Sequence, residues 1–344
     1  MLKKYGISCK VIPWLHREGD NKRMNTEIFS EQSNRLTQSV SKSIKGLSAL
    51  EIMMGHLGIA TGFFFLYPNR KAGILFVGIF FMLSGYGLMH NFNNQEGYLN
   101  HFLRKRLLNI LVPAYMVYII WGCLEGSIIK TYSLHTFLEY ILLREFWLKT
   151  NWYLFEIAIF YVVFYCLYKF FPKQRANVLL VVMTIIFVAF FLKIDNPWYG
   201  SSICFPFGIL YEQYGELLNK WMKKCYWLKC IVTLVICGLS IVLFFVLGND
   251  SIIGNPLARN IAALSFCIWL LFLLDKIKID YSLCKWFGNI SYEIFLFHPM
   301  WINIISYYTE NPWILLVSCI FMTLLSSILF HGCIVRCCKI FSKS

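Results

Sequence analysis

The chain has 344 residues, of which 58% are hydrophobic and only 15% are charged, and its mean hydropathy is +0.59. These values exclude an ordinary soluble domain and indicate a polytopic membrane protein. The formal net charge is +14, but the basic residues do not gather on a polar domain, so the charge does not indicate a nucleic-acid surface.

The first 43 residues are polar and precede every long apolar stretch. They have little apolar periodicity, and we expect them to form a flexible or interfacial cytoplasmic tail. Nothing resembles a cleavable signal peptide, because the first apolar stretch begins only near Gly46. We expect one transmembrane domain over residues 44–336 and a short cytoplasmic C-terminal tail over 337–344.

Ten apolar stretches have about the length that a helix needs to cross a bilayer. They predict an all-α transmembrane bundle of about ten spans. The sixth and ninth stretches are the weakest, and the sixth, with Pro206, Gly208 and Gly215, could be broken or re-entrant. The stretches are about 46–66, 72–90, 107–124, 152–171, 177–193, 199–215, 228–248, 257–275, 290–308 and 313–335.

The distribution of basic residues predicts the topology. If the loops are assigned alternately to the two sides, those on the N-terminal side carry 25 of the 32 Lys and Arg residues and the opposite loops carry seven. Cytoplasmic loops are enriched in basic residues. We therefore expect both termini in the cytoplasm. The longest external loop, about 125–151, alternates apolar and charged residues and predicts a short interfacial helix that could roof a site.

Two local patterns predict packing and no metal site. In the second stretch, Ser84, Gly85 and Gly87 would let another helix approach closely. Of the 13 cysteines, six lie singly inside apolar stretches, where Cys behaves as a small hydrophobic residue. There is no CxxC pair and no zinc-ligand spacing, so we predict that the protein holds no metal.

The most informative segment is KGLSALEIMMGH, residues 45–56. Eleven steps of a helix return to nearly the same face and span about 16 Å, which places Lys45 at the membrane surface and His56 deep in the span. An ionisable group at that depth is a functional-site hypothesis. The structural alternative is a histidine that hydrogen-bonds a neighbouring helix, with Gly55, Gly58 and Gly62 allowing close approach.

Five segments together resemble the acyltransferase-3 family of integral membrane acyltransferases. They match in order and spacing from about residue 40 onward. The resemblance implies about ten spans and transfer of an acyl group, most often acetyl, from a cytoplasmic coenzyme A thioester to a hydroxyl of a cell-surface carbohydrate. The segments are KGLSALEIMMGH (45–56), FFMLSGYGL (80–88), FLRKRLLNILVPAY (102–115), NWYLFEIAIFY (151–161) and FGNISYEIFLFHP (287–299).

The chain departs from the family at two positions. The family's hallmark is an arginine separated by ten residues from a histidine, and here Lys45 holds the arginine's place while His56 is kept. Lysine keeps the charge but cannot make the bidentate contact of a guanidinium. A second family pattern has two arginines three apart shortly before a proline. Here Arg106 and Asn109 precede Pro113, so the second arginine is missing.

A coenzyme A donor carries phosphates at one end and a thioester at the end of a long arm. An enzyme that uses it needs cations at the cytoplasmic surface and a base deeper in the membrane. We expect Lys45, Arg104, Lys105 and Arg106 to bind the donor, with Arg104 and Lys105 supplying the charge that the missing arginine would carry. His56 is the expected general base for the acceptor hydroxyl.

Four other ionisable residues lie within or near spans and are candidates for supporting or cavity-lining roles: Glu51, Glu156, Glu293 and His298. Glu51 is about 140° around the helix from His56 and should not orient its ring directly. A structural role explains each of the four equally well. Three further histidines fall near span ends and are not candidates: His90, His101 and His331.

These patterns predict a multi-pass O-acetyltransferase of a bacterial-type inner membrane. It would use acyl-CoA as co-substrate, bind no cofactor, and acylate a surface or capsular polysaccharide or its lipid-linked precursor. Its partners would be these substrates and membrane lipid, and no nucleic acid. The main alternative is a carrier or flippase for lipid-linked sugars, which should show paired discontinuous helices. A polysaccharide polymerase ranks last, because the external loops are small.

Overall fold

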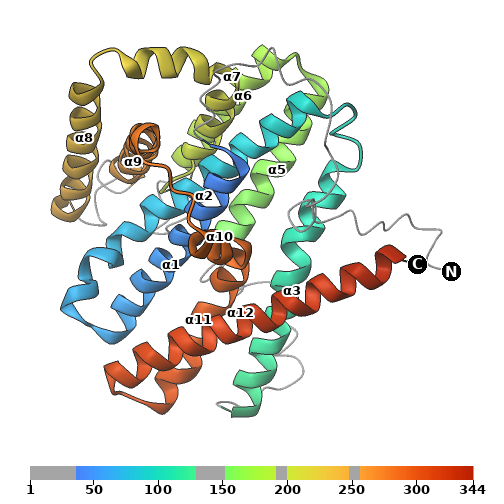
Figure 1. Ribbon diagram of the computed structural model, residues 1–344, viewed down its shortest axis with the longest axis vertical. Helices are drawn as coiled ribbons and strands as arrows, with labels where there is room; N and C mark the ends of the chain where they lie inside the picture. The colour runs from blue at the N-terminus through green and yellow to red at the C-terminus, as the bar shows by residue number, and fades with distance from the viewer. Residues whose placement is uncertain (1–35, 129–151, 191–199, 248–255, 344) are drawn as a thin grey trace.

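The computed structural model describes residues 36–128, 152–190, 200–247 and 256–343, and every regular element in these ranges is helical (Figure 1). The all-α prediction is confirmed for them. The predicted N-terminal tail and the predicted interfacial helix of the 125–151 loop fall largely outside the described residues. The helices are α1 (Gln38–Thr61), η2 (Phe64–Leu66), α2 (Tyr67–Asn94), α3 (Phe102–Ile128), α5 (Trp152–Phe170), α6 (Lys173–Phe190), α7 (Cys204–Lys223), α8 (Tyr226–Leu247), α9 (Pro256–Lys276), α10 (Ser282–Asn289), α11 (Ser291–Tyr308) and α12 (Pro312–Lys343).

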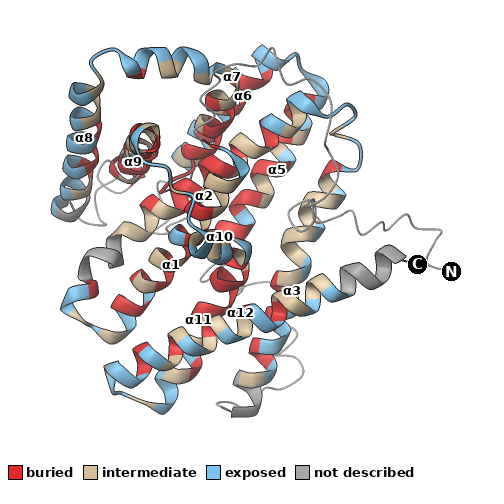
Figure 2. Cartoon of the chain, viewed as in Figure 1, coloured by how far each residue is buried: buried red, intermediate tan, exposed pale blue. Residues whose placement is uncertain are grey.

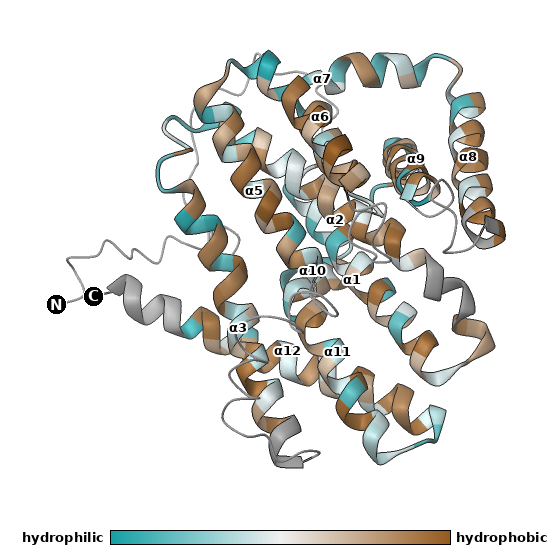
Figure 3. Cartoon of the chain, turned by 180° about the vertical axis from the view of Figure 1, so that it is seen from behind, coloured by the Kyte–Doolittle hydropathy of each residue, from teal (hydrophilic) through white to brown (hydrophobic). Residues whose placement is uncertain are grey.

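Seven helices among the described residues are long and apolar enough to cross a membrane: α2, α3, α5, α6, α8, α9 and α12. Their hydrophobic character is visible along their lengths in Figure 3. The other three predicted spans correspond to α1, α7 and α11, which are helices of 24, 20 and 18 residues. The multi-pass character is therefore supported, while the count of ten spans and the cytoplasmic location of both termini stay predictions.

Helix α7 is continuous and not broken by its proline. Pro206 lies in the first turn of α7, where the backbone N–H has no partner within the helix in any case. Gly208 has a packing role, because a Cβ there would meet the backbone carbonyl of Met82 in α2. On α2, a Cβ at Gly85 would meet the carbonyl of Phe205. The two glycines thus let the backbones of α2 and α7 touch.

Helices α1 and α2 lie at the centre of the bundle. Helix α1 packs against α2, α10 and α11, whereas α2 also packs against α7 and α9. Buried side chains concentrate on these central helices, and α8 presents a largely exposed outer face (Figure 2). Large apolar residues such as Leu228, Leu239 and Val246 are exposed on α8, which suits contact with lipid tails.

Two of the glycines predicted to allow close helix packing do not do so. A Cβ at Gly87 would meet nothing within 4 Å, so this residue makes no close helix contact. Gly62 ends α1 in the left-handed conformation, with φ of 69°, which glycine adopts without strain. Gly58 does pack closely, against Leu66 of η2.

The short helix α10 was not predicted from the sequence, which indicated only a loop ahead of the ninth span. It lies against the first turns of α1 (Figure 1). A Cβ at Gly288 would meet the carbonyl of Lys42, and a Cβ at Gly46 would meet the backbone of Cys284 and Gly288. The two backbones are therefore in direct contact.

Candidate active site

Helix α1 places Lys45 and His56 as the sequence predicts. It runs without interruption through both residues, so they share a face and are separated by about 16 Å along the axis. The helix begins after Thr37, whose hydroxyl accepts a hydrogen bond from the Val40 N–H at 3.2 Å. It ends at Gly62.

His56 meets His298 of α11 at the deeper end of this face. The Nδ1 atom of His56 is 2.8 Å from Nε2 of His298, and the two rings meet edge to edge with centroids 5.0 Å apart and 17° between their planes. The Nδ1 atom of His298 is 2.9 Å from the backbone carbonyl oxygen of Ile294. His298 is 1% exposed, whereas His56 is among the exposed residues. His56 therefore contacts a buried partner while the residue itself is exposed.

The predicted cations are only partly brought together. Arg106 of α3 donates a hydrogen bond of 2.6 Å to the hydroxyl of Tyr98, with its guanidinium carbon 5.8 Å from that ring's centre. Lys45 is half-buried and lies within range of the Arg106 charge. Lys105 is also half-buried and next to Arg106, whereas Arg104 is exposed. Lys45 and Arg106 thus form the centre of a positive region at the start of α1.

Two of the predicted carboxylates have partners other than the histidine pair. Glu156 of α5 is fully buried and accepts a hydrogen bond from the hydroxyl of Ser202, just before α7. Glu51 is half-buried on α1. Glu293 of α11 lies 2.7 Å from Nδ1 of His331 in α12. The geometry therefore gives Glu293 an inter-helical partner, and it favours a structural role for this carboxylate.

Sequence reasoning did not predict these contacts. It set His331 aside as a residue at a span end, and it did not pair His56 with His298 across 242 positions. It also gave Tyr98 no role. No short-range signal could have found these contacts, because each depends on how two helices or a loop and a helix meet.

The sequence profile of the acyltransferase-3 family, described as an acyltransferase domain, matches residues 42–332, which is most of the chain. The chain belongs to the acyltransferase-3 family. The matched range contains both halves of the histidine pair and the Lys45 and Arg106 positions. No curated protein and no solved structure gave a significant match.

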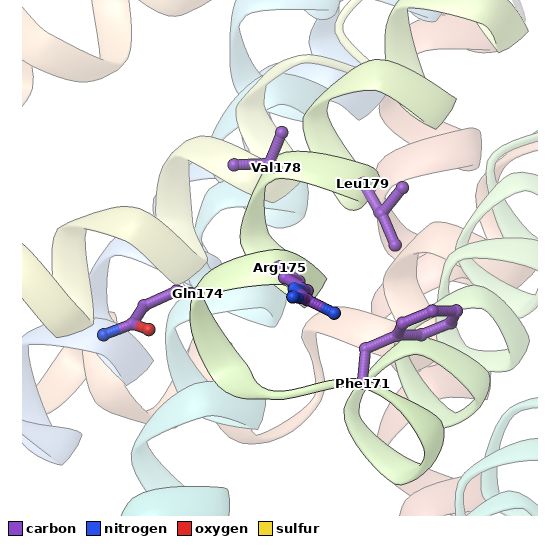
Figure 4. A pocket seen from close by; sticks show the side chains of 5 residues that line it. All are labelled: Phe171, Gln174, Arg175, Val178 and Leu179. Carbon is purple, nitrogen blue, oxygen red and sulfur yellow. The ribbon is translucent and has the colours of Figure 1, made fainter.

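This membrane acyltransferase also has a surface pocket away from its predicted site residues. The pocket lies where α5 passes into α6 (Figure 4). None of the predicted catalytic, donor-binding or supporting residues lines it. Its walls are Phe171, Gln174, Arg175, Val178 and Leu179.

Proposed function

We propose that this acyltransferase moves an acyl group, most simply acetyl, from cytoplasmic acyl-coenzyme A to a hydroxyl of a surface or capsular polysaccharide or its lipid-linked precursor. The observation that carries the proposal is the placement of an exposed histidine, His56, about 16 Å along one helix face from a cation, Lys45. Family membership supplies the reaction type, acyl transfer.

The donor's chemistry suits the two ends of α1. The phosphates of coenzyme A would meet Lys45 and Arg106, whose charges lie close together. The flexible arm would then run along α1 and bring the thioester to His56. A lysine ammonium holds phosphate as a point charge, and the guanidinium of Arg106 adds planar donors beside it.

In the proposed reaction, His56 takes the proton of the acceptor hydroxyl as that oxygen attacks the thioester carbonyl carbon. A C–O bond forms and the C–S bond breaks. The coenzyme A thiolate leaves and receives the proton back from the His56 imidazolium. The products are the O-acyl sugar and free coenzyme A, and His56 is returned to its neutral form.

The alternative of a sugar carrier finds no structural counterpart among the described helices. Paired discontinuous helices are the feature expected of such a carrier, and α7, the helix suspected of being broken, is continuous. Acyl transfer therefore remains the better-supported function, with the inner membrane of a bacterial-type cell as its proposed location.

Transfer of label tests the proposal directly. Purified protein in lipid would be given radiolabelled acetyl-coenzyme A and a mixture of lipid-linked oligosaccharides, and wild type would be compared with His56→Ala. We expect label on carbohydrate with wild type alone. If the wild type neither consumed acetyl-coenzyme A nor bound it, the proposal would be contradicted and the carrier would be favoured.

A further inference from the structure

We infer that His298 is a positioning residue that keeps the proton of His56 on Nδ1 and so leaves Nε2 free to act as the base. The inference rests on the proposed function, because it assigns an atom to the proton transfer proposed for His56. It starts from a contact between two imidazoles, each of which can donate or accept depending on its tautomer.

The tautomer of His298 follows from its backbone partners. Its Nδ1 lies 2.9 Å from the carbonyl oxygen of Ile294, and the ring also interacts with the backbone of Phe295. A carbonyl can only accept, so Nδ1 of His298 must carry a hydrogen. The Phe295 carbonyl is free to accept because Pro299, four residues later, has no N–H to donate to it.

A neutral His298 then has a bare Nε2. The ring is 1% exposed and contacts His56, the ring of Phe295 and the backbone of Ile294 and Phe295. A second proton would place a full charge in this buried site, which is costly without an opposite charge. The Nε2 atom therefore accepts, and the atom 2.8 Å away, Nδ1 of His56, must be the donor.

This arrangement fixes which nitrogen of His56 can accept a proton. With its single proton on Nδ1, the lone pair of Nε2 lies on the opposite edge of the ring, and this residue is exposed. When Nε2 takes a proton from the acceptor, Nδ1 still donates to His298, so the same contact holds the imidazolium. His298 is buried behind His56 and orients it without touching substrate.

Two substitutions at His298 separate its role as a hydrogen-bond acceptor from its role in filling space. His298→Leu keeps an apolar volume and removes the acceptor, and His298→Gln keeps an oxygen that can accept from His56. In purified protein in lipid, we expect His298→Leu to lower kcat by about 10²-fold with little change in KM for acetyl-coenzyme A. His298→Gln should recover most of that loss. His331→Leu, which removes a histidine from another pair, serves as the control and should leave kcat within about threefold of wild type.

A spectroscopic measurement addresses the tautomer without relying on activity. Nitrogen-15 spectra of histidine-labelled wild type in lipid, with the His56 signals assigned by their loss in His56→Gln, should show a protonated Nδ1 and an unprotonated Nε2. In folded His298→Leu, these signals should change toward the Nε2-protonated form. A wild-type His56 protonated on Nε2 would overturn the inference.

The outcomes also separate this inference from the proposed function. If wild type transfers label, His56→Ala does not, and folded His298→Leu keeps full kcat, then only the positioning role of His298 is wrong. An equal loss of kcat in His298→Leu and His298→Gln, with unchanged nitrogen-15 signals of His56, would also overturn the inference. If wild type consumes no thioester, the proposed function fails, whereas the nitrogen-15 result still decides the tautomer.

Discussion

The two halves of helix α1 are built differently. In the first half, Gly46 lies directly against the backbone of α10, and Ser43 and Ile44 are almost completely buried. In the second half, His56 and Ile59 are exposed, and His56 is held across the bundle by its contact with His298. The first half thus packs backbone to backbone on α10, whereas the second half, which also has buried residues such as Leu57 and Gly58, carries in addition an exposed histidine.

This difference lets packing and chemistry be tested separately along a single helix. A substitution at a glycine packed against α10 must displace backbone atoms and should act through folding. A substitution at an ionisable residue of the proposed site, such as Lys45 or His56, should act on activity. Substitutions at both kinds of position test this distinction.

Removing the imidazole should give the largest change in activity. We expect His56→Ala to lower kcat by about 10²- to 10⁴-fold, the range that a general base contributes. Because His56 is exposed, the temperature of unfolding and the amount of protein in the membrane should stay close to those of wild type. Label transfer and thermal unfolding of the same preparation measure both. Full activity in His56→Ala would remove the proposed base.

Filling the contact between α1 and α10 should instead destabilise the protein. A Cβ at Gly288 would meet the carbonyl of Lys42, so we expect Gly288→Ala to cost about 1–3 kcal/mol in the free energy of unfolding. Gly87→Ala is the matched control, because a Cβ there meets nothing within 4 Å. Thermal unfolding in detergent would compare the two. An equal unfolding temperature for both would show that the α10 contact is not tight.

The charge of Lys45 should affect donor affinity more than rate. We expect Lys45→Ala to raise the KM for acetyl-coenzyme A by about tenfold, the loss of one charge-assisted contact. Lys45→Arg should preserve or lower the KM, since a guanidinium can bind phosphate in a bidentate manner. Steady-state kinetics of the three proteins would decide. The same KM in all of them would contradict a phosphate contact at this position.

The smallest effect concerns the start of α1 and depends on pH. Ser39 donates a 2.5 Å hydrogen bond to Asp280, and Lys285 lies 3.0 Å from the same carboxylate. These partners lower the pKa of Asp280. The stability they add is present above the ordinary aspartate pKa of about 3.9 and is lost as the pH falls through the lowered value. Ser39→Ala should therefore lower the unfolding temperature slightly at pH 7 and not at strongly acidic pH. A loss of the same size at both would assign the effect to packing.

The sequence predicted the helical class and the family correctly, because both depend on local hydrophobicity and short motifs. That Lys45 and His56 lie on one helix face also followed from the regular number of residues per helical turn. Three features needed the packed structure. Helix α10 has only eight residues and is too short to stand out, Gly62 serves as a helix end, and Gly87 lies outside any close contact.

The candidate site was predictable as residues but not as partners. His56 and His298 were both candidates, and their pairing depends on how α1 meets α11. Glu293 was placed with the same group, yet it faces α12 and meets His331. On α11, His298 lies five positions after Glu293, enough to turn the two side chains about 140° apart. Sequence order alone does not show which helix packs against each face of α11.

The end of α1 at Gly62 lies close to the imidazole. Thr61, the last residue of the helix, lies five residues beyond His56, about 7.5 Å along the axis, while Lys45 lies about 16 Å away in the other direction. The imidazole is thus about twice as far along the helix from Lys45 as from the helix end. Under the proposed function, a thin flexible thioester arm would take the long route, and a bulky sugar chain would need to insert only one ring. Such an enzyme would choose its acceptor by which hydroxyl can reach inward, while the rest of the polymer stays outside.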